Sequence, residues 1–146
     1  MKNILVALGN LEHADQLIAQ AVKLAKLTDG KIWISHVTAS NPDDFLARES
    51  GPQFVFDERA EEQKKEAAFV KQCVSEIGKD HGIPAEGFIV EGSVSKAIKE
   101  KVEEHGIDLV IAGHRKKDFL YELFTSNKKK DLVDELKIPL LAVPIV

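Results

Sequence analysis

The residues with the clearest potential for chemistry follow an apolar run, Leu109–Ala112, that ends at Gly113. Glycine at the end of a strand is typical of loops that bind phosphate, because backbone N–H groups can approach an anion closely where no Cβ intervenes. The loop that follows carries Lys116 and Ser126 where further glycines would help. This segment therefore predicts a phosphate-type loop that lacks most of its glycines.

Two clusters of basic residues flank this loop, Arg115–Lys117 and Lys128–Lys130. They could attract phosphate or an acidic protein partner. Alternatively, they pair along a solvated helix with neighbouring carboxylates. The candidate carboxylates are Asp118, Glu122, Asp131 and Asp134. Sequence alone leaves both alternatives open.

The histidines and the single cysteine are the candidate catalytic or metal-binding groups. His36 and His114 each end a strand-like run, so both could border one crevice or simply hydrogen-bond locally. No base with an orienting partner can be identified from the spacing, so we expect no catalytic residues. None of the five histidines stands at metal-ligand spacing from another ligand, so we expect no metal site. Cys73 lies beside an apolar helical stripe and is expected to be a small core residue.

Longer motifs give no support for an enzyme. The chain contains no Gly-x-Ser-x-Gly elbow, no complete Walker loop and no Gly-x-Gly-x-x-Gly fingerprint. Acyl transfer, P-loop hydrolysis and dinucleotide chemistry therefore lose support.

Composition limits the class of protein. With 146 residues, we expect one domain over 1–146. No apolar run approaches the roughly 20 residues that span a bilayer, and the N-terminal run lacks a signal-peptide cleavage site, so we expect no membrane segment. A lone cysteine then favours the reducing cytoplasm. A net charge of −4 argues against general nucleic-acid binding.

Short apolar runs alternate with amphipathic stretches, which is typical of a parallel sheet covered by helices. Strands are expected at 4–8, 32–37, 87–90, 109–112 and 138–146. Helices are expected from Ala14 to a stop at Gly30, from Asp57 to His81, from Val94 to His105, and around Leu132–Leu136. Residues 38–56 are expected to form a long connection with at most a short helical turn. The fold class is thus α/β with five parallel strands.

In this order, the strands and the Gly113 segment resemble the universal stress protein family over essentially the whole chain. The similar segments are Ile4–Leu8, Ser35–Val37, Glu91-Gly92 and Leu140–Pro144. The resemblance implies a three-layer α/β/α sandwich with strand order 3-2-1-4-5, of the adenine nucleotide alpha hydrolase-like type.

The nucleotide-binding branch of that family carries Gly-x-x-Gly, nine residues, then Gly-Ser or Gly-Thr. Placed on this chain without gaps, the motif begins at Gly113 and then meets Lys116, Ser126 and Asn127. One of its three glycines is kept. An added Cβ at Lys116 or Ser126 would stand where phosphate oxygens approach backbone amides.

The same branch ends its first strand with an aspartate that contacts the nucleoside, where this chain has Gly9 followed by Asn10. Val37 matches the position whose backbone meets adenine. If a nucleotide binds, the resemblance places it against Gly9, Asn10, Val37, Gly113, Lys116, Ser126 and Asn127.

The pattern at Gly113, His114, Asp118, Phe119 and Ser126 is instead similar to the universal stress protein A branch. Members of that branch generally form dimers and do not bind ATP. We therefore expect a cytoplasmic stress-response protein without a cofactor, acting through contacts with an unidentified protein partner. The resemblance implies a homodimer through Leu140–Pro144. The alternative is a regulatory switch that binds ATP or AMP through a degenerate loop.

Overall fold

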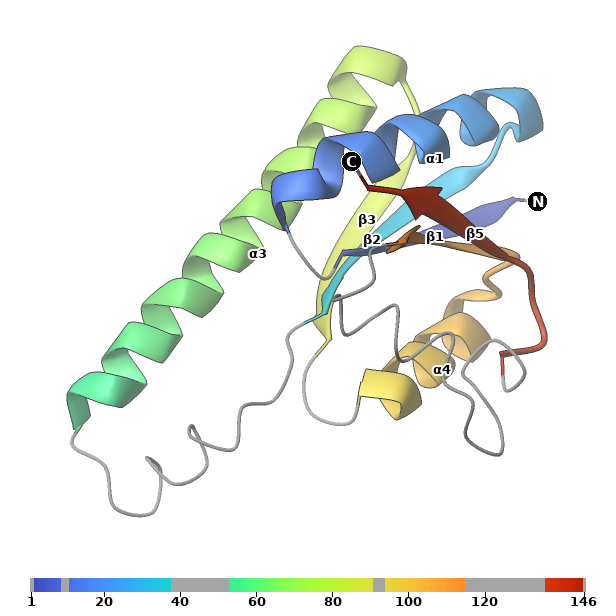
Figure 1. Cartoon of the computed structure of the whole chain (residues 1–146). Coiled ribbons are helices and arrows are strands. Elements are labelled where there is room, and N and C mark those ends of the chain that lie inside the picture. The colour runs from blue at the N-terminus through green and yellow to red at the C-terminus, as the bar shows by residue number, and fades with distance from the viewer. Residues whose placement is uncertain (1, 9–10, 38–52, 91–93, 115–135, 146) are drawn as a thin grey trace.

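The computed structural model describes residues 2–8, 11–37, 53–90, 94–114 and 136–145 (Figure 1). Strands and helices alternate along these ranges. The strands are β1 (Asn3–Leu8), β2 (Lys31–Val37), β3 (Ala85–Val90), β4 (Leu109–His114) and β5 (Leu140–Pro144). The helices are a 3-10 turn η1 (Leu11–His13), α1 (Ala14–Thr28), α3 (Gln53–His81) and α4 (Val94–His105).

The strands form one sheet in the order β3-β2-β1-β4-β5, and every neighbouring pair is parallel. This order confirms the predicted 3-2-1-4-5 arrangement. It places β1 at the centre, with β3 and β5 as the two outer strands. Because all strands run the same way, their carboxyl ends lie along one edge of the sheet.

Side chains of β1 alternate between two cores, one on each face of the sheet. Ile4, Val6 and Leu8 point into the core that α1 and α3 cover. Leu5 and Ala7 point into the opposite core, which includes Ile98 and Val102 of α4 and also Leu136. Figure 1 shows α1 and α3 on one side of the sheet and α4 on the other. The described helices therefore form the outer layers of a three-layer sandwich.

The end of α1 differs slightly from the prediction. Asp29, with φ of 55°, takes the left-handed position that we expected glycine to provide, and its N–H bonds to the carbonyl of Ala25. Aspartate is among the few residues that tolerate this conformation. Gly30 follows and also donates to Ala25, at 3.0 Å. At the end of α3, Gly82 does adopt a positive φ of 64°, as a glycine C-terminal stop requires.

Several predicted boundaries differ from the structure. Helix α3 begins at Gln53 rather than Asp57. Strand β3 begins at Ala85, because Ile32 N–H donates to the Pro84 carbonyl and starts the pairing there. Strand β5 spans only Leu140–Pro144 of the predicted 138–146. The predicted last helix lies mostly outside the described residues.

Helix α3 extends well beyond the sheet in Figure 1. Its described side chains keep Val70, Cys73 and Ile77 buried on the sheet side, while its other faces carry many exposed charged residues. Neither α3 nor any other helix within the described ranges is long and apolar enough to cross a membrane.

Gly87 of β3 lets α3 approach the sheet closely. A Cβ at this position would collide with Cγ1 of Val70 and lie 3.1 Å from Cγ2 of Val74. We therefore expect Gly87→Ala to lower the free energy of unfolding by roughly 1–3 kcal/mol, the usual cost of overpacking. Urea denaturation followed by circular dichroism measures this change.

Gly78→Ala is the matched control, because Gly78 lies in α3 and a Cβ there would meet only the Ile83 carbonyl oxygen, at 3.9 Å. Alanine is the better helix former, so this variant should gain up to about 1 kcal/mol. Equal stability of Gly87→Ala and the wild type would contradict the close packing of α3 on β3.

Candidate functional site

The carboxyl ends of β1, β2 and β4 meet at one edge of the sheet. Leu8 at the end of β1 pairs with His36, so Val37 lies just beyond it on one side. On the other side Ala7 pairs with Ala112, which brings Gly113 to the same edge. Open α/β sheets place ligands here, where the strand order reverses on either side of the central strand.

The structure thus places two of the predicted site residues, Val37 and Gly113, on strands that flank β1. The remaining five, Gly9, Asn10, Lys116, Ser126 and Asn127, lie outside the described residues. The two basic clusters, Arg115–Lys117 and Lys128–Lys130, lie outside them as well.

Packing gives the glycine at 113 a structural role. A Cβ there would lie 3.1 Å from Cγ1 and 3.4 Å from Cδ1 of Ile145, and 3.9 Å from Cδ1 of Leu17. Gly113 is not among the described residues with positive φ. The Ile145 side chain would have to give by a few tenths of an ångström to accept a Cβ, so this glycine is not by itself evidence for a phosphate.

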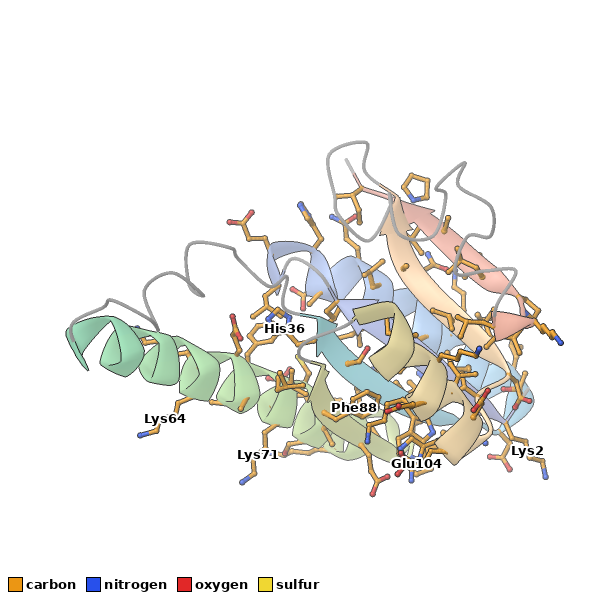
Figure 2. All side chains as sticks on the ribbon, turned by 90° about the horizontal axis from the view of Figure 1, so that it is seen from below. Lys2, His36, Lys64, Lys71, Phe88 and Glu104 are labelled. Atoms are coloured by element: carbon orange, nitrogen blue, oxygen red, sulfur yellow. The ribbon has the colours of Figure 1, made fainter. Side chains whose placement is uncertain are left out.

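His36 is buried, with 4% of its surface exposed. Its Nδ1 lies 3.2 Å from the carbonyl oxygen of Leu8, and its Nε2 lies 3.4 Å from Oε1 of Glu66 on α3. In Figure 2, His36 stands between α3 and the sheet. The predicted local hydrogen bond of His36 is confirmed, whereas Glu66 was missed because nothing near it in sequence marks it as a partner.

His114 ends β4, where it pairs with Pro144 of β5. Its side chain lies outside the described part, so whether it borders a crevice together with His36 stays a prediction. Within the described ranges, no three His, Cys, Asp or Glu side chains come together as metal ligands.

Cys73 is a core residue, as predicted. It belongs to the core under α1 and α3, with 7% of its surface exposed. Burial, followed by the nearby charges of Glu76 and Asp15, raises the pKa of the thiol from 9.0 to about 11. Little thiolate forms at neutral pH, so this cysteine is poorly suited to nucleophilic chemistry.

An aromatic cluster at the junction of β2, β3 and α4 also escaped the sequence analysis. The Trp33 and His105 rings stack at 4.0 Å between centroids, and Phe88 lies 6.0 Å from His105. Lys31 and Lys101 place their Nζ atoms 4.0 Å from the Trp33 ring and 5.1 Å from the Phe88 ring. Residues from three elements meet here, and we interpret the cluster as fastening the end of α4 to the sheet.

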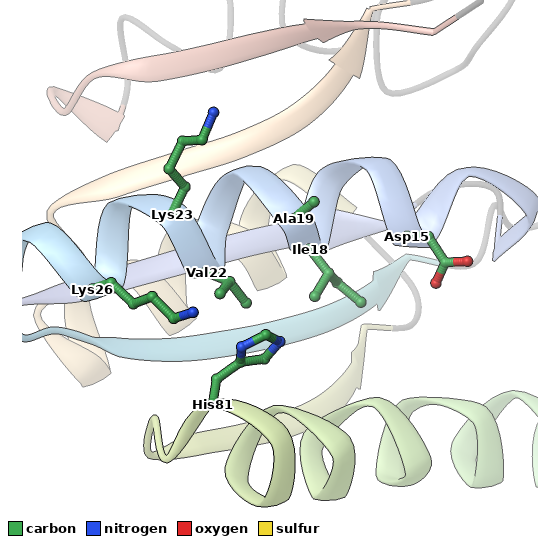
Figure 3. A pocket seen from close by; sticks show the side chains of 7 residues that line it. All are labelled: Asp15, Ile18, Ala19, Val22, Lys23, Lys26 and His81. Carbon is green, nitrogen blue, oxygen red and sulfur yellow. The ribbon is translucent and has the colours of Figure 1, made fainter.

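A groove of about 460 Å³ runs beside α1 (Figure 3). Ile18 and Val22 contribute apolar surface, and Asp15 lies at one end. Lys26 and His81 lie toward the other end, where α1 and α3 finish. Lys26 lies in the last turn of α1, where a cation stabilises the helix dipole, so it has a role there without a ligand. The residues that line the groove all belong to α1 and α3, and none lies at the end of a strand. We therefore place the candidate site at the carboxyl edge of the sheet and not in this groove.

The model of the universal stress protein family matches residues 1–144. Universal stress protein C of Escherichia coli is 28% identical over 98% of this chain and 95% of its own length. The universal stress protein A homolog of Haemophilus influenzae is 25% identical over 99% and 96%.

Solved structures give the same fold. A universal stress protein family protein from Arabidopsis thaliana with AMP bound aligns with a TM-score of 0.60 at 14% identity. The alignment covers 100% of this chain and 93% of the plant chain. At this identity the match shows a shared fold, and the AMP belongs to the plant protein.

The packing of Gly113 can be tested by a double-mutant cycle. Gly113→Ala should lower the free energy of unfolding by about 1 kcal/mol, because the terminal Ile145 side chain must give way. Ile145→Ala removes the neighbouring Cγ and Cδ atoms. In that background, Gly113→Ala should lower the free energy of unfolding much less than it does in the wild type. Urea titration of the wild type, both single variants and the double variant measures the coupling. Additive effects would show that Ile145 does not require glycine at this position.

Proposed function

The chain belongs to the universal stress protein family, and we propose that it acts as a cytoplasmic stress-response protein through contacts with other proteins. In this proposal it is a homodimer without a catalytic centre, a resident cofactor or a nucleic-acid partner. The observation that carries the proposal is the packing of Ile145 against Gly113, which gives the one retained motif glycine a role that needs no ligand.

The rest of the nucleotide motif supports the same view. Lys116 and Ser126 replace glycines, and Asn127 replaces the hydroxyl residue. Glycine permits a close approach of backbone N–H groups to phosphate, and a side chain hinders it. Gly9 stands where the family's aspartate contacts the nucleoside, so both phosphate and nucleoside contacts are weakened together.

A nucleotide-binding switch is the second candidate, favoured by the carboxyl edge itself. The ends of β1, β2 and β4 meet where open α/β sheets place ligands, and the Arabidopsis protein that shares this fold has AMP bound. Val37 would contribute only backbone groups, which any residue supplies. In this alternative the chain binds ATP or AMP and changes its protein contacts accordingly.

The proposed dimer uses β5 because this strand is an outer strand of the sheet. Its register pairs it with β4, which leaves its other edge available among the described strands. The strand is apolar, with Leu140 and Leu141 half-buried and Ala142 exposed. An outer strand with unpaired backbone groups and apolar side chains favours pairing with a second copy.

Nucleotide content is the first test. Protein purified without added nucleotide, denatured and analysed by ion-exchange chromatography should release less than a tenth of an equivalent of adenine nucleotide. Calorimetry should show no micromolar binding of ATP or AMP. A stoichiometric nucleotide in the wild type would replace the first proposal by the second.

A variant with Lys116→Gly, Ser126→Gly and Asn127→Ser is the control, because it restores the motif of the nucleotide-binding branch. If this variant binds a nucleotide and the wild type does not, then Lys116, Ser126 and Asn127 prevent binding at a site that the fold still provides. Absence of binding in both would point to the loss of the aspartate at Gly9 as well.

The dimer is tested by Ala142→Asp, since a carboxylate at this exposed position would be buried without a partner when two β5 strands meet. Light scattering at tens of micromolar should give twice the chain mass for the wild type and the single chain mass for this variant. Ala19→Asp, at an exposed position on α1, should leave the dimer intact. A wild-type monomer would overturn the dimer without affecting the nucleotide question.

A further inference from the structure

The contact of His36 with β1 fixes which ring nitrogen carries hydrogen. A carbonyl oxygen only accepts hydrogen bonds, so Nδ1, at 3.2 Å from the Leu8 oxygen, must be the donor. A neutral imidazole carries one N–H, and in this geometry Nδ1 holds it. The Nε2 atom of the neutral ring is therefore a bare acceptor.

That acceptor faces a second one. Oε1 of Glu66 lies 3.4 Å from Nε2, and an ionised carboxylate also only accepts hydrogen bonds. Two acceptors held at this distance inside a protein repel each other and lose the hydrogen bonds that water would give them. Adding one proton to Nε2 turns the repulsion into a charge-assisted contact between an imidazolium and a carboxylate.

Nothing larger than a proton fits the observations. His36 Nε2 and Glu66 Oε2 are both closed off from solvent, and neither makes a hydrogen bond with the described residues. Two ligands are too few for a metal ion, and no third His, Cys, Asp or Glu of the described chain joins them. The Glu66 side chain, 21% exposed, provides a route by which water can exchange the proton.

Glu66 is the charged group that meets His36 among the described residues. β1 contributes the Leu8 carbonyl, and β3 contributes the apolar Ile89 as the cross-strand neighbour of His36. The next turn of α3 presents Val70, which is buried. The flanking Lys64 and Lys65 on α3 are exposed.

We propose that His36 and Glu66 form a buried proton-binding pair that fastens α3 to the carboxyl ends of β1 and β2, so that the attachment of α3 to the sheet depends on pH. The pair bridges three elements: His36 on β2 bonds to the end of β1 and contacts α3. It lies beside Val37, at the carboxyl edge where open α/β sheets place ligands. Acidification tightens this attachment, and loss of the proton releases Glu66 toward solvent.

The direction of the pH dependence follows from proton counting. Above about pH 6.5 a histidine in the unfolded chain has lost its proton, whereas the folded pair retains one. The folded state then binds one more proton than the unfolded state, so stability falls as pH rises until the folded pair also loses its proton. Below about pH 6.5, the contact contributes its full amount to the free energy of unfolding.

The protonation state can be read directly by NMR. Long-range ¹H–¹⁵N correlation on the wild-type protein should show both His36 ring nitrogens protonated at about pH 7.5, where an unperturbed histidine is neutral. Amide exchange at Glu66 and Val70 should accelerate when His36 loses its proton, beyond the intrinsic increase with pH. A neutral His36 ring at that pH would overturn the proposal without requiring any variant.

Glu66→Gln gives the second readout. The introduced amide can donate to Nε2, so the variant should keep His36 neutral with the proton on Nδ1. Above about pH 6.5, the unfolding equilibrium constant of the wild type should rise relative to this variant by up to about tenfold per pH unit, the limit for one proton.

Glu76→Gln, an exposed position on the same helix that contacts Gln72, is the matched control and should follow the wild-type pH profile. Parallel profiles for the wild type and Glu66→Gln would refute the proton linkage. The outcome does not depend on whether the protein binds a nucleotide or forms a dimer.

Discussion

The central strand β1 lies between β2 and β4 with Ile4–Leu8 fully buried, so its backbone polar groups find partners only in those two strands. Burial on both faces also forces each of these side chains into one core or the other. A shift of one residue would exchange the side chains of the two cores. The positions of both helix layers and of the carboxyl edge therefore depend on the register of this strand.

A polar network at the opposite edge of the sheet holds that register. Asp108 accepts hydrogen bonds from the N–H groups of Lys2 and Asn3, at 2.9 and 3.0 Å, and donates its own N–H to the Asn3 carbonyl. The Asn3 side chain accepts from Trp33 Nε1 and donates to the Gly106 carbonyl. Fixing β1, β2 and β4 at their amino ends aligns their carboxyl ends, which is how Leu8, Val37 and Gly113 come to share an edge.

Sequence reasoning predicted the elements because each depends on local periodicity, and the strand order in the sheet followed from the family resemblance. Buried parallel strands such as Leu109–Ala112 are continuous apolar runs, and α1 repeats its apolar residues at helical spacing. Boundaries were less predictable where a tertiary contact sets them. β3 starts at Ala85 because β2 pairs with it there, and α3 includes Phe54–Phe56, which apolar content alone did not mark as helical.

The candidate site was predictable in its location and much less so in its contacts. Sequence located the strand ends at Val37 and Gly113, since a parallel sheet brings such ends together. It gave no sign that Ile145 packs against Gly113 or that Glu66 faces His36. Both contacts join segments far apart in the chain, and neither leaves a periodic pattern.

Two glycines show why a motif has to be weighed against packing. At Gly87 and at Gly113 an added Cβ would meet other side chains, Val70 and Val74 in one case and Ile145 in the other. Gly87 belongs to no ligand motif, yet its replacement is more tightly constrained by neighbours than that of Gly113. A glycine at the start of a phosphate-type loop can therefore have a packing role that is independent of any ligand. Gly113 on its own does not separate a chain that binds a nucleotide from one that does not.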